Sequence, residues 1–352
     1  MPGGALVHIP DGYLGPQTYL PAWAVMAPLW SWASARLKRT LSVRRLPMMA
    51  LAAAFAFVVM MFNVPLPGGT SGHAVGSVLV AVLLGPWAAV VAVSLALAVQ
   101  ALLFGDGGIT ALAANCFTMA VVMPFAGWWT YRLLAGASSA ASRRRYAAAA
   151  AGGYVGVNVA ALATGALLGI QPLIARDPSG RPLYCPFGLS VAVPAMAVSH
   201  LLVVGFVEAA VTALALAYLT RTEPGLTLAA AAQEPTSRAL KRFALAVAAL
   251  AVLSPFGMIL AARFGGGTAW GEWSADELSK LVGSLPPGLR RLSSLWRAPL
   301  PGYGPLAAQG ASTTVQSVWY AICAVVGVGA VAAVVLVLRR LFTRRERDDR
   351  AA

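Results

Sequence analysis

The sequence contains few charged residues. Asp, Glu, Lys and Arg together fill 11% of its 352 positions, whereas apolar residues fill 59%, and the mean hydropathy is +0.74. A soluble domain carries about 25% charged residues. Apolar runs long enough to span a bilayer recur along the chain, so the composition excludes a soluble globular protein. It predicts an all-α fold, that of a polytopic helical membrane protein.

Cysteine and lysine are also scarce. The three cysteines, Cys116, Cys185 and Cys323, are too scattered for a disulfide framework or a Cys-x-x-Cys metal site. Residues 1–18 contain no Lys or Arg, and no small-residue cleavage pattern follows the first apolar run, so no signal peptide is predicted. None of the three lysines follows glycine, which excludes a Gly-Lys-Ser/Thr nucleotide loop. We therefore expect no enzyme and no permanent cofactor; active uptake would need partner subunits that hydrolyse ATP.

Nine apolar segments are expected to form helices. They are Thr18–Leu37, Leu46–Phe62, Ala74–Leu84, Pro86–Phe104, Thr110–Leu134, Tyr146–Ile170, Phe187–Leu219, Phe243–Ala262 and Val315–Leu338. The polar, proline-containing stretch 223–242 is typical of a linker. This pattern predicts a seven-segment core within 7–222, a two-segment module at 243–342 and a charged tail at 343–352.

Two of these segments have unusual lengths. Ala74–Leu84 has only eleven residues and is cut off by Gly85-Pro86, which indicates either a half-helix or a tilted, extended one. Phe187–Leu219 is longer than one span needs and contains Pro194. It is interpreted as an interfacial helix followed by a span, or as one kinked helix.

The net charge of +14 would suggest nucleic acid as a partner of a soluble protein, but in a membrane protein it is sorted by side. If every segment crosses once and the N-terminus lies outside, 19 of the 26 basic residues fall inside and 7 outside. Cytoplasmic loops carry the excess of Lys and Arg. The distribution predicts a multi-pass protein of the cytoplasmic membrane with its N-terminus outside, its C-terminus inside and the lipid bilayer, not nucleic acid, around it.

Two of the three histidines share the predicted outer side. His8 precedes the turn-forming residues Pro10 and Asp11-Gly12, and His73 ends the Gly/Pro-rich loop 63–73. Paired, they form the two halves of a transition-metal site. The alternative is a capping histidine beside a flexible loop.

Two histidines are too few for a zinc site, which takes four ligands. Backbone nitrogen atoms can supply the missing ligands. A free terminal amine, a deprotonated amide and the Nδ1 of a histidine at position two close a planar chelate, and a second imidazole completes a square N4 set suited to Ni(II) or Cu(II) and open to Co(II). That chelate requires a histidine at position two, and this one stands at position eight.

Four polar side chains fall inside apolar segments: Gln100, Asn115, His200 and Glu208. His200 and Glu208 are eight residues apart, about two helical turns, and so share roughly one face. The pair is interpreted as a structural polar seam between helices, with a proton or ion path as the alternative. Asn115 stands where it would hydrogen-bond a loop or orient a ligand histidine.

Several motifs together resemble the CbiM/NikM family, the substrate-binding membrane components of energy-coupling-factor transporters for cobalt and nickel. The resemblance covers about 7–222. It rests on His8-Ile9-Pro10-Asp11-Gly12, Gly69-Thr70-Ser71-Gly72-His73, the run from Gln100 to Gly108, the run from Ala114 to Met119, and the run from Pro194 to His200 with Glu208. The stretches Gly267–Trp273 and Ala298–Tyr303 look like the outer loop of the family's two-span companion subunit, although Ser254-Pro255-Phe256-Gly257 replaces the usual Pro-Asp-Gly-Leu-Glu motif.

The resemblance implies import of Co(II) or Ni(II) as the transported substrate, together with a membrane scaffold subunit and cytoplasmic ATPases. It implies metal ligands at Val7 (the amine), His8 and His73, with Asn115, Gln100 and Ser71 around them. The rival hypotheses are a proton-coupled secondary transporter that uses His200 and Glu208, and a membrane scaffold that does not transport.

The resemblance also bears on where the protein begins. The chelate fails if six further residues separate the amine from Val7-His8. The segment 1–6 has no charge, periodicity or targeting pattern. Valine is what a GUG codon encodes internally, and the same codon as an initiator gives methionine. We therefore predict that the mature chain starts at position 7 and that 1–6 is non-native; the alternative is a genuine extension, with His8 binding through its side chain alone.

Overall fold

The computed structural model describes residues 8–40, 45–66, 70–139, 141–222, 236–267, 269–271, 273–308 and 310–351. Within these ranges the chain is a helical bundle with one short hairpin. The elements of the first half are α1 (Pro16–Thr40), α2 (Leu46–Met60), β1 (Asn63–Leu66), β2 (Thr70–His73), α3 (Ser77–Leu84), α4 (Pro86–Val99), η2 (Gln100–Phe104), α5 (Leu112–Cys116), η3 (Phe117–Val122) and α6 (Met123–Ala135). The second half contains α7 (Arg143–Gly169), α8 (Gln171–Ile174), α9 (Leu189–Ser199), η4 (His200–Val204), α10 (Gly205–Thr222), α11 (Ser237–Leu253), α12 (Pro255–Arg263), α13 (Ala275–Val282), α14 (Pro287–Leu292), η7 (Leu306–Ala308) and α15 (Thr313–Ala351).

The all-α membrane fold predicted from composition is confirmed, and each of the nine apolar segments contains a helix. Six helical stretches of the described residues are long and apolar enough to cross a membrane: Pro86–Phe104, Leu112–Ala135, Arg143–Ile174, Leu189–Thr222, Ser237–Arg263 and Thr313–Val337. α2 is apolar but shorter. The helices α2, α3 and α4 form the centre of the bundle, since nearly all their side chains are buried.

The loop predicted at 63–73 forms a β-hairpin in its described part, which the sequence did not indicate. β1 and β2 pair antiparallel, with Asn63 opposite His73 and Leu66 opposite Thr70. The strands are short and contain proline and glycine, so propensity alone favoured a loop. The pairing places His73 at the end of a strand, opposite Asn63.

The short segment Ala74–Leu84 is a half-helix, one of the two alternatives open from sequence. α3 has eight residues and follows β2 after three residues, the last of which, Gly76, has a left-handed φ of +72°. The four residues of β2 at about 3.3 Å each, with eight helical residues at about 1.5 Å each, cover roughly 25 Å, somewhat less than a bilayer core of about 30 Å. Strand and half-helix together thus have most of the reach of one span.

Phe187–Leu219 proves to be one uninterrupted helical run. α9, η4 and α10 follow one another without a break from Leu189 to Thr222, 34 residues. η4 is a π-helical turn that begins at His200. The alternative of an interfacial helix followed by a separate span is therefore wrong, since Pro194 is accommodated inside α9.

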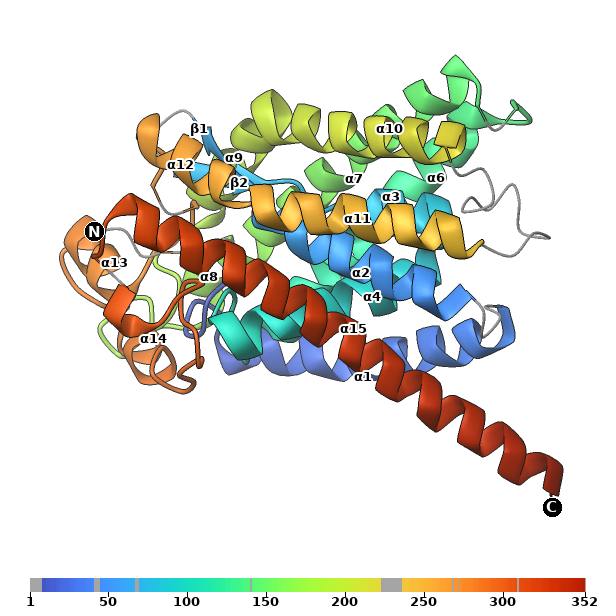
Figure 1. Cartoon of the computed structure of the whole chain (residues 1–352). Coiled ribbons are helices and arrows are strands. Elements are labelled where there is room, and N and C mark those ends of the chain that lie inside the picture. Colours follow the sequence, from blue (N-terminus) through green and yellow to red (C-terminus); the bar gives the residue numbers. More distant parts are fainter. Residues whose placement is uncertain are drawn as a thin grey trace.

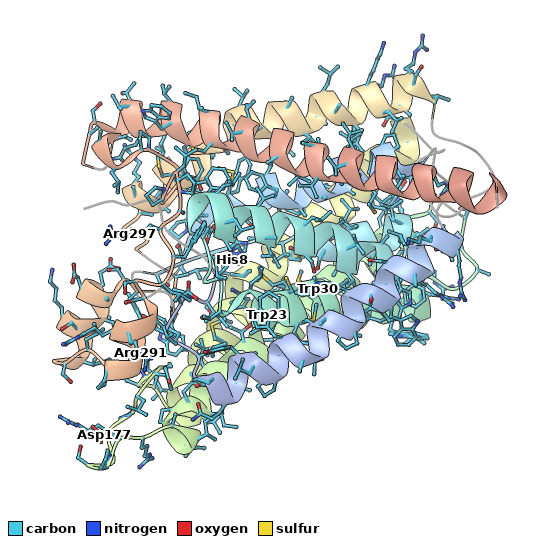
Figure 2. All side chains as sticks on the ribbon, turned by 90° about the horizontal axis from the view of Figure 1, so that it is seen from below. His8, Trp23, Trp30, Asp177, Arg291 and Arg297 are labelled. Carbon is cyan, nitrogen blue, oxygen red and sulfur yellow. The ribbon has the colours of Figure 1, made fainter. Side chains whose placement is uncertain are left out.

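The two-span tail packs against one side of the core. α11 and α15 contact each other and both contact α2, as Figure 1 shows, while α12 contacts β1. α13 and α14 gather at one end of the bundle, and the C-terminus lies at the other (Figure 1). His8 lies toward that first end, as do Asp177, Arg291 and Arg297 (Figure 2).

Two predicted boundaries in the tail need correction. The linker was placed at 223–242, but α11 begins at Ser237, where Thr236 accepts a hydrogen bond from the Ala239 amide as an N-cap. The charged C-terminal segment 343–352 was predicted to be separate from the last helix, whereas α15 continues to Ala351. Positions 223–235 of the linker lie outside the described residues.

Candidate metal centre

The turn after His8 is tied to the loop that follows η2. The carboxylate of Asp11 accepts hydrogen bonds from the amides of Ile109 (3.0 Å) and Thr110 (2.7 Å). Gly108 approaches so closely that a Cβ there would lie 2.2 Å from the Asp11 nitrogen. No side chain fits in that space. These contacts fix the turn at Asp11-Gly12, and the turn in turn fixes the backbone next to His8.

Asn115 holds the backbone next to His8. Its Oδ1 accepts from the Ile9 amide (3.2 Å) and its Nδ2 donates to the Ile9 carbonyl (3.1 Å). Both partners belong to one peptide residue, so the side chain fixes the direction of the chain. Of the two roles expected for Asn115, the structure shows the contact with a loop backbone; its side-chain hydrogen bonds go to Ile9 and not to the His8 ring.

The rings of His8 and His73 meet edge to face. Their centroids are 5.2 Å apart and their planes form an angle of 79°. His8 is buried, with 2% of its surface exposed. The pairing inferred from shared sidedness thus corresponds to direct contact between the two halves of the site, although 65 positions separate them in sequence.

An oxygen atom lies close to Nδ1 of each ring, as an ion-pair contact for His8 and a hydrogen bond for His73. His8 Nδ1 lies 3.1 Å from Asp106 Oδ1, and His73 Nδ1 lies 2.9 Å from the Ala74 carbonyl. A ligand histidine usually donates one ring N–H to a carboxylate or carbonyl and binds the metal through the other nitrogen. This arrangement suits metal binding through the two Nε2 atoms. A chelate through His8 Nδ1 requires that ring to turn away from Asp106.

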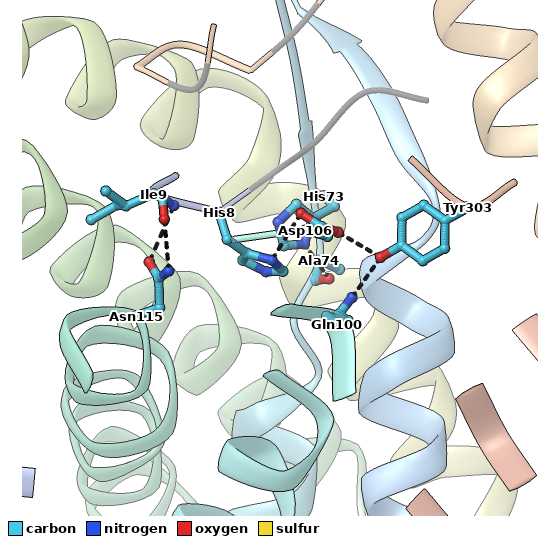
Figure 3. Close-up of polar contacts among 8 residues, drawn as sticks. All are labelled: His8, Ile9, His73, Ala74, Gln100, Asp106, Asn115 and Tyr303. Carbon is cyan, nitrogen blue, oxygen red and sulfur yellow. Dashed lines mark hydrogen bonds and ion pairs between the residues drawn. The ribbon is translucent and has the colours of Figure 1, made fainter. Parts of the chain in front are cut away.

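A chain of polar side chains extends from His8 to the tail (Figure 3). Tyr303 donates to Asp106 Oδ2 (2.5 Å), and Gln100 Nε2 donates to the Tyr303 hydroxyl (3.1 Å). Burial, then the charge of Asp106, raises the pKa of Tyr303 well above 10, so the hydroxyl stays protonated and donates. Gln100 was expected near the site, and it acts here through Tyr303.

Sequence reasoning missed Asp106 and Tyr303 as site residues. Asp106 stands inside a quoted motif, between Gly105 and Gly107, but its spacing from His8 gives no hint of contact. Tyr303 is 197 positions from Asp106, and a single sequence contains no signal for such a pair.

The tail's loop also caps the end of η2. The Trp296 indole donates to the Leu102 carbonyl (3.1 Å), and the amides of Leu300 and Gly302 donate to the carbonyls of Leu103 (3.0 Å) and Phe104 (2.9 Å). These carbonyls lie at a helix end, where they have no partner within the helix. The loop thus completes a core element directly beside Asp106.

All three histidines line one cavity of about 70 Å³. His8 and His73 border it together with Ser71 and Asn115, and His200 borders it with Met196. Ala269 and Trp270 bring the tail's loop to its wall. The presence of His200 in this cavity could not be predicted, because it depends on how η4 packs against β2.

His200 and Glu208 form hydrogen bonds with different partners. Glu208 accepts from the amides of Val75 (2.7 Å) and Gly76 (3.1 Å), just before α3 begins. His200 Nδ1 lies 2.8 Å from the Met196 carbonyl. Eight residues, about 12 Å along the helix axis, separate them. No hydrogen bond joins them among the described residues: Glu208 binds amides just before α3, whereas His200 binds groups of its own helix.

Two further site predictions remain. Ser71 is buried, lines the cavity, and has no hydrogen-bond partner for its hydroxyl among the described residues. Val7 and the segment 1–6 lie outside the described residues. Within the described part of the chain, no group of three or more His, Cys, Asp and Glu side chains is placed to hold a metal ion.

These features define a multi-pass helical membrane protein with a buried, nitrogen-rich cavity at one end of its bundle. Residues 8–226 match the family model of the CbiM cobalt uptake substrate-specific transmembrane region, and the chain belongs to this family.

Relatives and solved structures agree with that assignment. The chain is 45% identical over 342 residues to the "Fused nickel transport protein NikMN" of Rhodobacter capsulatus, covering 93% of this chain and 95% of that protein. It is 45% identical over 276 residues to the "Probable fused nickel transport protein LarMN" of Lactiplantibacillus plantarum, covering 78% and 80%. A crystal structure of a transition metal transporter shares 49% identity and a TM-score of 0.58, covering 62% of this chain and 94% of that one.

Proposed function

We propose that this chain is the substrate-binding membrane component of an importer of Co(II) or Ni(II), and that the ion binds between His8 and His73. The contact between these two rings, each with an oxygen atom close to its Nδ1, is the observation that carries the proposal. Relatives named as nickel and cobalt transport proteins support the choice of metal. Imidazole nitrogen suits both ions, so availability rather than geometry decides between them.

The remaining ligands depend on where the mature chain begins. A chain that starts at position 7 supplies a terminal amine and the His8 amide, and the ion is then held by a planar chelate in which His8 binds through Nδ1. A chain with the full extension binds through Nε2 of both histidines and leaves Asp106 on His8. The intact mass of the native protein and X-ray absorption of the bound Ni(II) decide between the two.

Transport needs partners in this proposal. The chain has no nucleotide loop, so cytoplasmic ATPases and a membrane scaffold subunit supply the energy. We place the histidine end outside and the C-terminus in the cytoplasm, because 19 of 26 basic residues then face inward. Cysteines introduced in 137–142 should be shielded from an impermeant thiol reagent added outside, and those in 282–286 should react; the reverse pattern overturns this topology.

The tail is proposed to be the fused companion module, and its role is to hold the site in shape. Tyr303 buttresses Asp106, and Asp106 orients His8. A carboxylate beside a metal-binding histidine fixes the orientation of the ring and raises its basicity as a ligand. We therefore expect the tail to change the metal affinity without supplying a ligand atom of its own.

The decisive experiment is metal analysis of the purified chain, with Co(II) and Ni(II) competing for it. We expect one tightly bound ion per chain, lost in His8→Ala and in His73→Ala. ATP-independent accumulation by the chain alone would favour a secondary transporter, but the Glu208 carboxylate is engaged by backbone amides and by Thr212, which suits a structural role. Unimpaired uptake by the His73→Ala variant would indicate a scaffold.

A further inference from the structure

The cavity beside His8 and His73 has a distinctive set of donor atoms. Besides imidazoles, three of the ten methionines of the chain border it: Met119, Met123 and Met196. Among the described residues, no carboxylate and no thiol borders it. The side-chain donors that it offers are therefore imidazole nitrogen and thioether sulfur, with neutral hydroxyl and amide groups beside them.

The Nε2 nitrogen of His8 has no hydrogen-bond partner among the described residues, although it is buried. An unpaired buried nitrogen costs free energy unless a ligand meets it. The ring of His73 lies against that of His8, with the centroids 5.2 Å apart (Figure 3). The His200 ring, by contrast, is turned back to the Met196 carbonyl of its own helix (2.8 Å). Two imidazoles, rather than three, therefore meet within the described part of the chain.

The thioethers reach this cavity from two helical stretches. Asn115 holds the backbone of Ile9, next to His8, and Met119 follows it by four residues, about one turn. Met196 belongs to α9. Methionine often fills irregular gaps in an apolar core. These two side chains are instead only partly buried, and they border a space that they share with imidazoles and hydroxyl groups.

Two imidazoles and a thioether form a donor set for a soft ion with few ligands. Thioether sulfur is a soft ligand and favours Cu(I). Cu(I) accepts about two or three donors, whereas Ni(II) prefers a square-planar or tetragonal set. The histidine pair and one methionine therefore satisfy Cu(I) without any backbone ligand.

The charge beside the pair also favours a monovalent ion. Asp106 places its Oδ1 3.1 Å from His8 Nδ1, and both side chains are buried. The cost of moving an ion into a medium of low dielectric constant rises with the square of its charge, so it is about four times larger for a divalent ion than for a monovalent ion of the same radius. One carboxylate neutralises a monovalent ion completely. A divalent ion needs a second negative charge, which in the planar chelate comes from the deprotonated backbone amide.

We propose that the cavity also binds Cu(I), held by the imidazoles of His8 and His73 and by a methionine thioether, and that Cu(I) bound there excludes Co(II) and Ni(II). This inference goes beyond the proposed function, because it concerns a different ion, but both ions use the same pair of histidines. Cu(I) is then a ligand that blocks uptake of the divalent ions. The methionines distinguish the soft ion from the harder ones, whereas the histidines bind both kinds.

The test uses the purified full chain without oxygen, with Cu(I) supplied as its bicinchoninate complex, so that competition with the chelator gives the affinity. We expect one Cu(I) per chain and release of bound Ni(II) as Cu(I) is added. X-ray absorption of the bound copper should show sulfur beside nitrogen. The variant Met119→Leu/Met123→Leu/Met196→Leu nearly conserves the apolar volume and removes the three sulfur atoms. In this variant the ratio of Cu(I) affinity to Ni(II) affinity should fall at least tenfold, and the sulfur signal should disappear.

A matched control replaces three methionines elsewhere. Met26, Met48 and Met60 are buried and do not border the cavity. The variant Met26→Leu/Met48→Leu/Met60→Leu should leave the ratio of the two affinities unchanged within twofold. Thermal unfolding of each variant confirms that the proteins compared are folded. If the cavity variant does not fold, the sulfur signal of copper bound to the wild type decides instead, and its absence overturns the inference.

The outcomes separate this inference from the proposed function. A wild-type chain that binds Ni(II) but not Cu(I), or that holds both ions together, overturns the inference and leaves the proposed function standing. A chain that binds Cu(I) at this site but neither Co(II) nor Ni(II) supports the inference and overturns the proposed function. Cu(I) binding that survives in His8→Ala/His73→Ala, or that is unchanged in the cavity methionine variant, overturns the inference. A chain that binds none of the three ions overturns both.

Discussion

The central helices of the core and the long helices of the tail are all apolar, but they are buried to very different extents. α2, α3 and α4 have few exposed side chains, whereas α11 and α15 expose much of their surface. Hydropathy shows that a helix is compatible with lipid; it does not show whether lipid or protein surrounds it. The core is thus expected to determine stability, while the tail acts through the few polar contacts that its loop makes at the site.

The largest effect should come from the core's own ligands. Replacing His73 by Ala removes one of two imidazoles, and we expect Ni(II) affinity to fall at least 100-fold, which corresponds to about 2.8 kcal/mol. Isothermal titration of the purified protein measures this change. Asp177→Asn, on an exposed loop at the same end of the bundle, is the control and should leave the affinity unchanged. Equal losses would show that general surface charge, rather than coordination, draws the ion in.

The next effect concerns core stability. Glu208→Ala leaves the amides of Val75 and Gly76 without an acceptor inside an apolar bundle, and an unsatisfied buried group costs about 1–3 kcal/mol. We expect a lower midpoint of thermal unfolding in detergent, by roughly 2 kcal/mol in free energy. Thr212→Val, which removes a weaker contact to the same carboxylate, should cost less. If proton coupling were the role of Glu208, transport would fail in Glu208→Gln while the unfolding midpoint stayed unchanged.

A smaller effect should come from the tail. Tyr303→Phe removes the donor to Asp106 but keeps the ring, and we expect Ni(II) affinity to fall by about tenfold. That is the low end of the 10–100-fold loss typical when a residue that holds a ligand in place is replaced. Tyr320→Phe is the matched control, because that hydroxyl donates to the Met61 carbonyl (2.8 Å) and does not contact Asp106. Equal affinities of the two variants would show that the hydrogen bond from Tyr303 to Asp106 does not contribute to Ni(II) binding.

The smallest effect is expected at Ser71. Its hydroxyl lies in the cavity wall without a partner among the described residues, so Ser71→Ala should change Ni(II) affinity less than twofold. A tenfold loss in the same titration would contradict this expectation. It would show that the hydroxyl contacts the ion or a water molecule bound to it.

The fold was largely predictable because long apolar runs dictate helices that span a bilayer. The exceptions are informative. Ala74–Leu84 was recognised as too short, but its extended partner strand, Thr70–His73, contains no hydropathy signal. The π-turn at His200 was also hidden, since π- and α-turns accept the same residues and differ only in which amide bonds to which carbonyl.

The site was predictable in part. His8 and His73 could be paired because only three histidines exist and two shared a predicted side. His200 was grouped with Glu208 because their spacing puts them on one face of a helix. The spacing does not show which residues of other elements each of them contacts. The contact between Asp106 and Tyr303 joins two modules across 197 positions, and only tertiary packing brings these side chains together.

Tyr303 and Asp106 belong to one polypeptide, so their encounter is intramolecular. A short flexible tether gives an effective concentration on the order of millimolar. A loop that binds its target with a dissociation constant of ~10 μM is then docked about 99% of the time, whereas two separate proteins at ~1 μM would be apart for most of it. The covalent join makes this contact independent of expression level. Every copy of the protein therefore holds Tyr303 against Asp106.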